Sequence, residues 1–430
     1  MNHQNSLLIQ DSLVVDPSQN LNQIADIWIE NGTIKAIDKP GSFADKKFNQ
    51  IIRAPGCWTL PGFIDAHVHL REPGQESKET IKAGSQAAIH GGFTTVACMA
   101  NTTPVNDNAN ITNYIQQRAK DTAHCRVYPI GAVSKGLKGK ELAEIGSMVK
   151  AGAVAISDDG MPVMNSLLMR QAMEYAKEFN IPVISHAEDK HLVAGGIMNE
   201  GEASYSLGVK GNPAAAEEIM VAREIALCRL TGCHVHIAHV STKLAIDHIR
   251  RAKDEGLPIT AEVTPHHLFL TDKKLMNYDT HCKMAPPLRT REDTLALQKA
   301  LADGTIDILA TDHAPHTKTD KQTSLNEASF GVTGLQTAMA LTMQLVLSEK
   351  VSLNRWTESL TLLPAKILNL PHGTLKKGSL ADISIIDPNQ TWKFDLKSNV
   401  SKNANSPFIN YELKGKVIYT LLSGEVVYES

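Results

Sequence analysis

The pattern of apolar and polar positions changes twice along the chain. Near both ends, short apolar runs alternate with turn signals, whereas the long middle part alternates short apolar runs with amphipathic segments of helical period. Alternation of strand and helix indicates a parallel sheet, because each parallel strand needs a crossover connection to the next. The pattern therefore predicts a large α/β unit enclosed between two β-rich ends.

The middle part contains eight strand-helix units, each an apolar run of strand length followed by a segment with helical period. The predicted strands cover residues 63–68, 94–99, 126–131, 153–157, 182–185, 235–238, 259–263 and 306–310. The predicted helices cover residues 79–90, 111–120, 141–150, 167–179, 215–230, 244–254, 294–302 and 337–347. Eight such units over roughly 300 residues predict a (β/α)8 TIM barrel, in which active sites lie at the carboxyl ends of the strands.

The two ends of the chain each predict a β-hairpin. Asn31-Gly32 and Ser423-Gly424 both lie between two apolar runs, and an Asn-Gly pair in this position favours a type I′ turn, since both residues tolerate a positive φ. A lone hairpin is marginal in water, so we expect the two ends to pair with each other. The expected organisation is a composite β-sandwich domain, 1–58 plus 371–430, and a barrel domain, 59–370.

Composition and charge narrow the class of protein. The chain has 430 residues, of which 42% are apolar and 21% charged, and a net charge of -3, as in an ordinary globular protein. There is no basic excess to suggest nucleic acid, and no apolar run approaches the ~18 residues that a membrane span needs. The six cysteines form no Cys-x-x-Cys pair, and the N-terminus lacks the basic start of a signal peptide. We therefore expect a cytoplasmic protein with no membrane or nucleic-acid partner.

Residues of the metal-ligand type follow most of the predicted strands. His67 and His69 end the first strand, and side chains two residues apart on a strand point to the same side. The others follow the second, fourth, fifth, sixth and eighth strands: Asn101, Asp158 and Asp159, His186, His239, and Asp312. A role in fold stability alone would not place so many of these residues at strand ends, because a buried, unpaired charge is costly. The sequence therefore predicts a metal site at one end of the barrel.

Four other histidines are interpreted differently. His234 and His236 repeat the His-x-His spacing, but they lie at the start and middle of the sixth strand, on the opposite parity from His239. We interpret them as core residues or as residues that support the site from behind. His266 and His267 follow the seventh strand, and one of them could reach the mouth of the site, since consecutive strand residues face opposite ways.

The set of ligand types indicates the chemistry. Four imidazoles and two or three carboxylates exceed what one tetrahedral zinc requires, so a binuclear site with a bridging carboxylate fits better, and nitrogen ligands with few thiols favour zinc. Gly-x-Gly-x-x-Gly, a phosphate loop and Gly-x-Ser-x-Gly are all absent. Hydrolysis by activated water is the chemistry that remains, with Asp312 placed as a proton shuttle and Arg71 suited to binding a substrate carboxylate.

Several motifs resemble those of a known family. Pro-Gly-Phe-Ile-Asp-Ala-His-Val-His-Leu-Arg-Glu-Pro-Gly at 61–74 is similar to the signature of the amidohydrolase superfamily and, through Leu-Arg-Glu-Pro-Gly, of the dihydroorotases. Further matching motifs stand at 99–104, 157–160, 283–289, 311–316 and 330–335. The resemblance covers nearly the whole chain and is nearest to the bacterial class I enzymes. These enzymes interconvert dihydroorotate and N-carbamoyl-L-aspartate in pyrimidine biosynthesis.

The resemblance also implies how the metal ions are held. His67 and His69 would bind one zinc ion, and His186 and His239 a second. Asp159 would bridge the two ions. Many amidohydrolases bridge with a carboxylated lysine at this place, but the fourth predicted strand ends Ser-Asp-Asp and offers no lysine.

Catalytic and substrate-binding roles follow from the same resemblance. Asp312 would be both a metal ligand and the catalytic acid/base. The implied substrate contacts are His69, Arg71, Asn101, His316, Phe330 and Gly331. One position departs from the pattern: Ala285 stands where the family usually has Asn, which removes a hydrogen bond worth about 1 kcal/mol and bears on substrate affinity more than on reaction type.

Two alternative functions stay open. A hydantoinase or allantoinase would hydrolyse a related cyclic amide on the same barrel, but such relatives typically use the lysine bridge and lack the arginine after His-x-His. A metal-free homologue would only scaffold aspartate carbamoyltransferase, but such homologues have lost metal ligands, and all six are present here. A homodimer and an association with aspartate carbamoyltransferase are further expectations.

Overall fold

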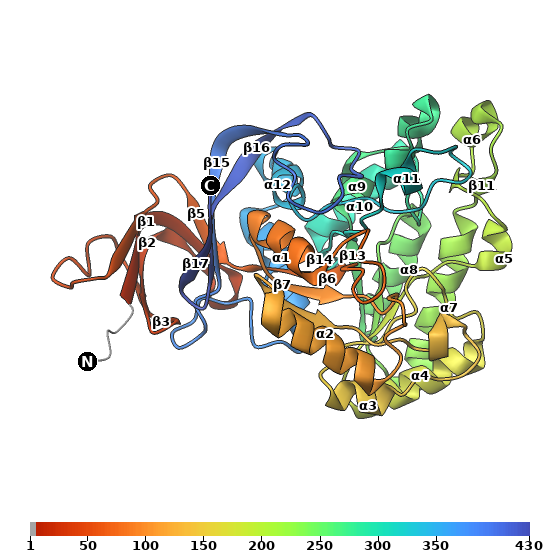
Figure 1. Cartoon of the computed structure of the whole chain (residues 1–430), viewed down its shortest axis with the longest axis horizontal. Coiled ribbons are helices and arrows are strands. Elements are labelled where there is room, and N and C mark those ends of the chain that lie inside the picture. The colour runs from red at the N-terminus through yellow and green to blue at the C-terminus, as the bar shows by residue number, and fades with distance from the viewer. Residues whose placement is uncertain (1–5) are drawn as a thin grey trace.

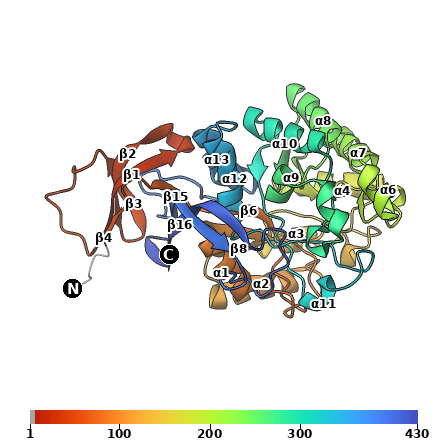
Figure 2. The ribbon, with the colours of Figure 1, turned by 90° about the horizontal axis from the view of Figure 1, so that it is seen from above.

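A small β-sheet and a larger α/β part lie side by side in the computed structural model, which describes residues 6–430 (Figure 1). Residues 1–5 of the expected terminal domain lie outside the described residues. The red N-terminal strands and the blue C-terminal strands meet in the sheet, and Figure 2 shows this meeting from above. The expected pairing of the two chain ends is therefore present.

The terminal sheet has eight strands drawn from both ends of the chain, in the order β17-β16-β15-β5-β1-β2-β3, with β4 paired to β1. The strands are β1 (Ser6–Asp16), β2 (Leu21–Glu30), β3 (Thr33–Asp38), β4 (Gln50–Arg53), β5 (Trp58–Pro61), β15 (Ile383–Phe394), β16 (Tyr411–Leu422) and β17 (Glu425–Glu429). A sandwich needs two sheets, whereas this pairing is continuous, because β5 pairs with β1 on one side and with β15 on the other. The strands of the expected terminal domain thus form one continuous hydrogen-bonded sheet.

Both predicted hairpin turns are present. Asn31 and Gly32, between β2 and β3, have φ values of 51° and 78°, and Ser423 and Gly424, between β16 and β17, have 49° and 77°. Two successive positive φ values are the geometry of a type I′ turn. Ser423 lacks the preference of Asn for this conformation, but its amide donates to Asp382 Oδ1 at 2.8 Å. This hydrogen bond holds the turn in place.

The α/β part is built on short parallel strands in two groups. One sheet contains β6 (Phe63–Val68), β7 (Phe93–Cys98) and β8 (Arg126–Pro129), and the other contains β9 (Val183–Ser185), β12 (Val235–Ile237), β13 (Ile259–Val263) and β14 (Ile308–Leu309). Single parallel bridges, Gly131 to Ile156, Ile156 to Val183 and His313 to Val68, join the groups. Followed in order, the pairings lead from β6 back to β6.

The predicted fourth strand, 153–157, is reduced to the bridges at Ile156. Its backbone still forms hydrogen bonds to the segments on either side. The amide of Ser157 donates to the carbonyl of Gly131 at 2.8 Å, and the carbonyl of Ile156 accepts from the amide of Ile184 at 2.9 Å. The segment therefore occupies the place of a strand, although it is too short to form a regular ladder.

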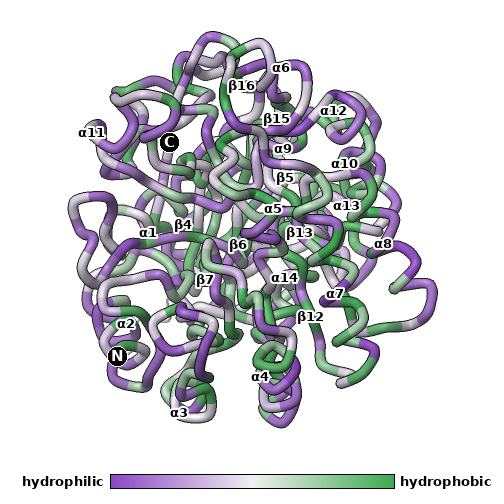
Figure 3. The backbone as a smooth tube through the Cα atoms, turned by 90° about the vertical axis from the view of Figure 1, so that its right-hand side faces the viewer, coloured by the Kyte–Doolittle hydropathy of each residue, from purple (hydrophilic) through white to green (hydrophobic). Residues whose placement is uncertain are grey.

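The eight predicted helices are present and surround the parallel strands (Figure 3). They are α1 (Ile81–His90), α2 (Ala109–Thr122), α3 (Ile145–Lys150), α4 (Ser166–Glu178), α7 (Ala215–Thr231), α8 (Lys243–Asp254), α10 (Arg291–Asp303) and α12 (Ala338–Leu347). The helix α3 begins later than predicted, because Leu142 pairs with Ser134 in an antiparallel bridge instead. Side-chain caps begin five of these helices: Thr80, Asn108, Asn165, Thr242 and Thr290 each accept a backbone N–H of the first turn.

The short elements were not predicted from the sequence. The helices are α5 (Lys190–Val193), α6 (Glu202–Leu207), α9 (Pro265–Phe269), α11 (Lys318–Lys321), α13 (Leu353–Leu360) and α14 (Leu362–Ile367), and the strands are β10 (Met198–Asn199) and β11 (Gly211–Asn212). Most are shorter than the window over which a helical or strand period can be recognised. Within residues 6–430, no helix is both long enough and apolar enough to span a membrane.

Aromatic packing and one ion pair join the sheet to the α/β part. Trp58 on β5 packs against Trp356 on α13 with ring centroids 6.3 Å apart, and Trp356 packs against Phe63 on β6 at 5.7 Å. Arg126, at the start of β8, donates from Nε and Nη2 to the two oxygens of Asp382 at 3.2 and 3.1 Å. The Asp382 side chain is 7% exposed, so this ion pair is mostly shielded from water.

We expect Asp382→Ala to lower the free energy of unfolding by about 2–4 kcal/mol, because it leaves the guanidinium of Arg126 and the amide of Ser423 without their acceptor. Chemical denaturation measures the change. Glu255→Ala is the matched control, because its ion pair with Arg229 is half exposed and should contribute about 0–1 kcal/mol. Equal effects of the two substitutions would contradict a structural role for the Arg126–Asp382 pair.

Candidate active site

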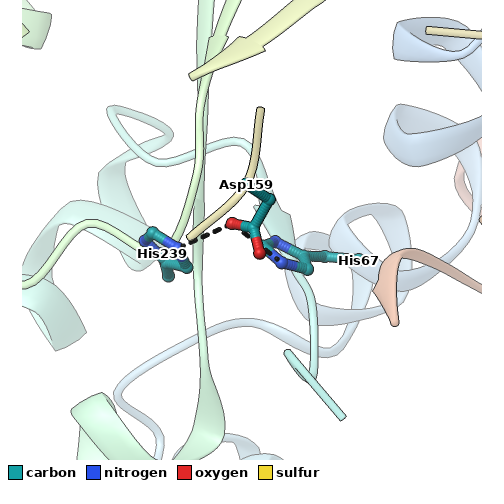
Figure 4. Close-up of side chains that lie close together, drawn as sticks. All are labelled: His67, Asp159 and His239. Carbon is teal, nitrogen blue, oxygen red and sulfur yellow. Dashed lines mark ion pairs between the residues drawn. The ribbon is translucent and has the colours of Figure 1, made fainter. Parts of the chain in front are cut away.

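The strand ends bring the predicted metal ligands together. Two groups have ligand atoms that all lie within 4.8 Å of one another: His67, Asp159 and His239, and His67, His69 and Asp312. All of these side chains are buried, and Figure 4 shows the first group, with both histidines directed at the carboxylate of Asp159. His186 belongs to neither group, but its Nδ1 lies 3.3 Å from Asp159 Oδ1. The predicted cluster is therefore assembled at one place.

Asp159 lies among four imidazoles. Its Oδ1 is 3.5 Å from His67 Nε2, 3.4 Å from His239 Nε2 and 3.3 Å from His186 Nδ1. Its Oδ2 is 3.4 Å from His69 Nε2. These separations are long for hydrogen bonds, and they match the ~3.4 Å between two ligands of a tetrahedral zinc with bonds of about 2.1 Å. The spacing thus fits ligands that share a metal ion.

The charge of Asp159 also fits a metal ligand. Burial by itself would raise the pKa of this carboxyl, but the charge of His67 and the hydrogen bonds from His186 and His239 outweigh burial and lower the pKa well below its usual range. The same balance, with His67 and His69 as the main partners, lowers the pKa of Asp312. Both carboxylates are therefore ionised at neutral pH and can serve as ligands.

Asp312 faces the same histidines from the end of β14. Its Oδ1 lies 3.0 Å from His69 Nε2 and 3.5 Å from His67 Nε2. The backbone of Asp312 has a φ of 46°, a conformation that costs a residue with a Cβ about 1–3 kcal/mol. This strain places the carboxylate at the edge of the cluster, on the wall of the cavity.

The non-ligating nitrogens of three of the histidines have polar partners. His67 Nδ1 lies 2.5 Å from Glu262 Oε1, His69 Nδ1 lies 2.8 Å from Asn101 Oδ1, and His186 Nε2 lies 3.6 Å from Glu188 Oε2. Such partners orient the imidazole and decide which nitrogen carries hydrogen. His67 Nε2 is buried and has no hydrogen-bond partner within residues 6–430. A nitrogen in this state is suited to binding a metal ion.

Glu262 and Glu188 were missed by the sequence analysis. Glu262 lies in the apolar run of β13, and Glu188 lies two residues after His186. Burial would raise the pKa of both, but their histidine partners lower them, that of Glu188 to about 2. A charged residue within a predicted buried strand was the available signal for Glu262. Glu188 had no comparable signal, because a carboxylate in a loop is ordinarily exposed.

A cavity of about 490 Å³ lies beside the cluster. Its walls include all six predicted substrate contacts, together with the metal-ligand candidates Asp159, His186 and Asp312 and also Glu188, Asn212 and Ala285. Ala285 presents a methyl group where an Asn would offer an amide. The cavity has the size of a small-molecule site.

Arg71 is a buried cation beside this cavity. Its Nε donates to the carbonyl of Pro315 at 3.3 Å, and it forms no ion pair with any carboxylate in residues 6–430. Its Nη2 lies 3.3 Å from His316 Nε2, but that nitrogen is closer to the carbonyl of Phe330, at 2.7 Å. The Phe330 carbonyl can only accept, so Nε2 of His316 carries hydrogen and has no lone pair for Arg71, which leaves Nη2 of Arg71 available. Burial lowers the pKa of Arg71 to about 10, so the guanidinium stays charged at neutral pH.

Two buried lysines hold the loop that carries Phe330. Lys283 Nζ donates to the carbonyls of Leu325 and Asn326 at 2.8 and 3.1 Å, and it lies 4.3 Å from the centroid of the Phe330 ring. Lys321 Nζ donates to three carbonyls, including that of Ser329 at 2.7 Å. Burial lowers the pKa of Lys283 to about 8 and that of Lys321 to about 7. These contacts fix one wall of the cavity.

Other candidates lie away from the cluster. Asp158 accepts from the amides of Val133 and Ser134 at 2.7 and 3.0 Å, so its carboxylate is occupied elsewhere. Neither His266 nor His267 lines the cavity, although the sequence left open that one of them reaches its mouth. The ring of His267 is held by Thr264 and by the carbonyl of Pro286.

Comparisons with known proteins agree with this geometry. A family profile described as "Dihydro-orotase-like" matches residues 56–245. The dihydroorotase of Syntrophus aciditrophicus (strain SB) is 48% identical over 424 residues, covering 98% of this chain and 99% of that protein. The dihydroorotase of Geobacter metallireducens is also 48% identical over 424 residues, covering 99% of this chain and 100% of that protein.

Solved structures with the same fold include two related hydrolases. The L-hydantoinase (dihydropyrimidinase) from Arthrobacter aurescens has a TM-score of 0.88 and 26% identity, covering 98% of this chain and 96% of that chain. The dihydropyrimidinase from Brevibacillus agri has a TM-score of 0.85 and, at 24% identity, shows the fold alone, covering 99% of this chain and 95% of that chain. With nearly half of its residues identical to those of named relatives over almost its full length, the chain belongs to the dihydroorotase family.

Proposed function

We propose that the protein is a dihydroorotase, a cyclic amide hydrolase that interconverts (S)-dihydroorotate and N-carbamoyl-L-aspartate in de novo pyrimidine biosynthesis. The observation that carries the choice of substrate is Arg71, a buried guanidinium beside a cluster of metal-ligand type with no carboxylate partner in residues 6–430. A buried cation without a counter-charge is costly, so the cavity favours a ligand that brings a carboxylate. Dihydroorotate and its product both do.

The proposal includes a finer description of the fold. The parallel pairings that return to β6 support a closed (β/α)8 TIM barrel, with ligand side chains at the carboxyl ends of its strands. We propose two domains close to the predicted ones, a terminal domain of 1–58 plus 371–430 and a second domain of 59–370. Because β5 belongs to the terminal sheet as far as Pro61, we place the first boundary after that residue.

We propose zinc as the metal, with two ions per subunit. His67 and His69 would hold one ion, and His186 and His239 would hold the other. Asp159 would bind both ions, and Asp312 would be a further ligand. Two features support this assignment. The candidate ligands are imidazoles and carboxylates, and Nε2 of His67 has no hydrogen-bond partner in residues 6–430. When bound, zinc supplies Lewis acidity that lowers the pKa of water and polarises the scissile amide carbonyl.

Asp312 is proposed as the catalytic acid/base. Its ionised carboxylate accepts a proton from the attacking water and donates it to the ring nitrogen as the amide C–N bond breaks, and the same transfers run backwards in ring closure. The position of Asp312 on the cavity wall, 3.0 Å from His69 Nε2, supports this role.

The remaining residues are proposed to orient the substrate. Arg71 would pair with its carboxylate and Asn101 would donate from its side-chain amide, since Asn101 Oδ1 already accepts from His69. His316 and the Phe330 carbonyl bond to each other and shape the pocket. The amide of Gly331 donates to Lys283, and a Cβ at this residue would lie 2.8 Å from that of Ala314. Gly331 therefore contributes shape.

A hydantoinase-type activity is the alternative for which an observation exists, since the L-hydantoinase of Arthrobacter aurescens has the same fold. Hydantoin carries no ring carboxylate and would leave Arg71 unpaired, so we favour dihydroorotate. A homodimer, an association with aspartate carbamoyltransferase and a cytoplasmic location stay predictions.

Removing the proposed bridge should remove metal and activity together. We expect Asp159→Ala to lose most bound zinc and all measurable dihydroorotate hydrolysis while circular dichroism stays unchanged, because Asp159 contacts histidines of both proposed ion sites. Zinc content is measured by elemental analysis. Asp158→Ala is the control and should keep its zinc, because that carboxylate bonds to Val133 and Ser134. The reverse result would move the bridge to Asp158.

Asp312 should be separable from metal binding. We expect Asp312→Asn to retain most of its zinc, because the four histidines and Asp159 still hold the ions, and to lose at least ~10²-fold in kcat, the scale for a general acid/base. Steady-state kinetics with dihydroorotate, together with zinc analysis of the same preparation, give both values. Normal turnover by a zinc-loaded variant would exclude the assignment.

Substrate preference should depend on Arg71. The wild-type protein should prefer dihydroorotate to dihydrouracil and hydantoin, and Arg71→Met should lower kcat/KM for dihydroorotate by about 30- to 4000-fold, the effect of losing a charged partner worth ~2–5 kcal/mol. Activity on dihydrouracil should change little. Arg170→Met, which removes an exposed arginine, is the control. Equal efficiency of the wild type on dihydroorotate and hydantoin would replace this proposal with the hydantoinase alternative.

A further inference from the structure

A buried chain of hydrogen bonds runs behind the metal-ligand cluster, through strands β12 and β13. Glu262 and Thr260 share one face of β13, His236 lies beside them on β12, and His234 precedes that strand with the same parity. This chain uses the second His-x-His pair of the sequence, to which the proposed catalysis assigns no role. Glu262 and His236 have no solvent exposure at all.

Glu262 connects three histidines from two strands, β6 and β12. Its Oε1 lies 2.5 Å from His67 Nδ1 and 3.1 Å from the backbone amide of His239, and its Oε2 lies 3.1 Å from His236 Nε2. A carboxylate only accepts hydrogen bonds, so all three nitrogens must carry hydrogen and donate. His67 therefore carries hydrogen on Nδ1, which is held by Glu262, and its Nε2 faces Asp159 and Asp312.

The remaining hydrogens in the chain follow from this assignment. His236 donates from Nε2, so its Nδ1 has a lone pair and accepts from the hydroxyl of Thr260 at 2.8 Å. The oxygen of Thr260 then accepts from His234 Nε2 at 2.8 Å. Each donor in the chain meets one acceptor, so the alternative tautomer of His67 would leave at least one pair of atoms mismatched.

The contact with His239 constrains the backbone as well. His239 has a φ of 32°, a conformation that a residue with a Cβ adopts only when its surroundings hold it. Its amide hydrogen bond to Glu262 is one such restraint. Glu262 thereby contacts one proposed ligand of each zinc ion. It bonds to the ring of His67 and to the backbone of His239.

We propose that Glu262, supported by His236 and Thr260, is a positioning residue that prepares both metal sites by fixing the tautomer of His67 and the backbone of His239. The inference rests on the proposed function, because it assumes that the cluster binds zinc. Partners of this kind around metal ligands affect metal affinity about 10- to 100-fold. Glu262 itself would contact neither metal nor substrate.

The first test measures zinc affinity. Glu262→Gln keeps the shape of the side chain but can no longer accept from all three donors, so we expect both zinc dissociation constants, measured by chelator competition, to rise about 10- to 100-fold. Glu224→Gln is the matched control, because Glu224 is equally buried and bonds to Ser185 and Arg223 but to no ligand histidine. The control should stay within about twofold of the wild type.

The outcomes separate this inference from the proposed function. A wild-type protein that binds no zinc would overturn both. A wild type that binds two zinc ions and a folded Glu262→Gln variant with unchanged affinity would overturn only the role of Glu262. An equal loss of affinity in Glu224→Gln would also overturn it, because the effect would then reflect any buried carboxylate.

A second measurement needs no substitution of Glu262. In metal-free wild-type protein labelled with nitrogen-15 at histidine, we expect the spectrum of His67 to show hydrogen on Nδ1, the nitrogen that faces Glu262. The signals of His67 are assigned by their absence from His67→Asn. A neutral His67 ring with its hydrogen on Nε2 alone would overturn the inference whether or not Glu262→Gln folds.

Discussion

The carboxylate of Asp159 imposes the main constraint on this structure. It is buried and lies within 3.5 Å of imidazole nitrogens that come from three different strand ends. An ionised group in such a place is tolerated only when opposite charge and hydrogen bonds compensate for the lost water. The parallel arrangement meets this need, because strands that run in one direction end at one face and deliver their side chains to the same point.

The site is assembled at the expense of local backbone strain. Three residues with a Cβ have positive φ values there, 62° at Arg71, 32° at His239 and 46° at Asp312, and each costs about 1–3 kcal/mol. Each follows a parallel strand, where the chain turns away and a side chain must still point inward. The packed strands beneath supply the stability that such conformations require, which is why the strained residues stand at the strand ends.

Sequence reasoning found what depends on local pattern and missed what depends on contacts between distant strands. His67, His69, His186, His239 and Asp312 could be predicted because each follows an apolar run, and a strand end is a local property. Glu262 could not be assigned, since its partners His67 and His239 are brought to it only by the fold. The pairing of the two chain ends was expected, but the role of β5 was not, because β5 joins two strands that are distant in sequence.

The short side chain of Asp159 has a consequence for the whole cluster. A bridging lysine would reach far from its strand, whereas an aspartate requires the histidines to come close, and the ring centroids of His186 and His239 are only 4.6 Å apart. Glu262 and Asn101 accept from Nδ1 of His67 and His69, so Nε2 of each ring faces carboxylate oxygens at the centre. The arrangement is stable only when positive charge lies at its centre, and a shared metal ion would supply that charge to all of these side chains at once.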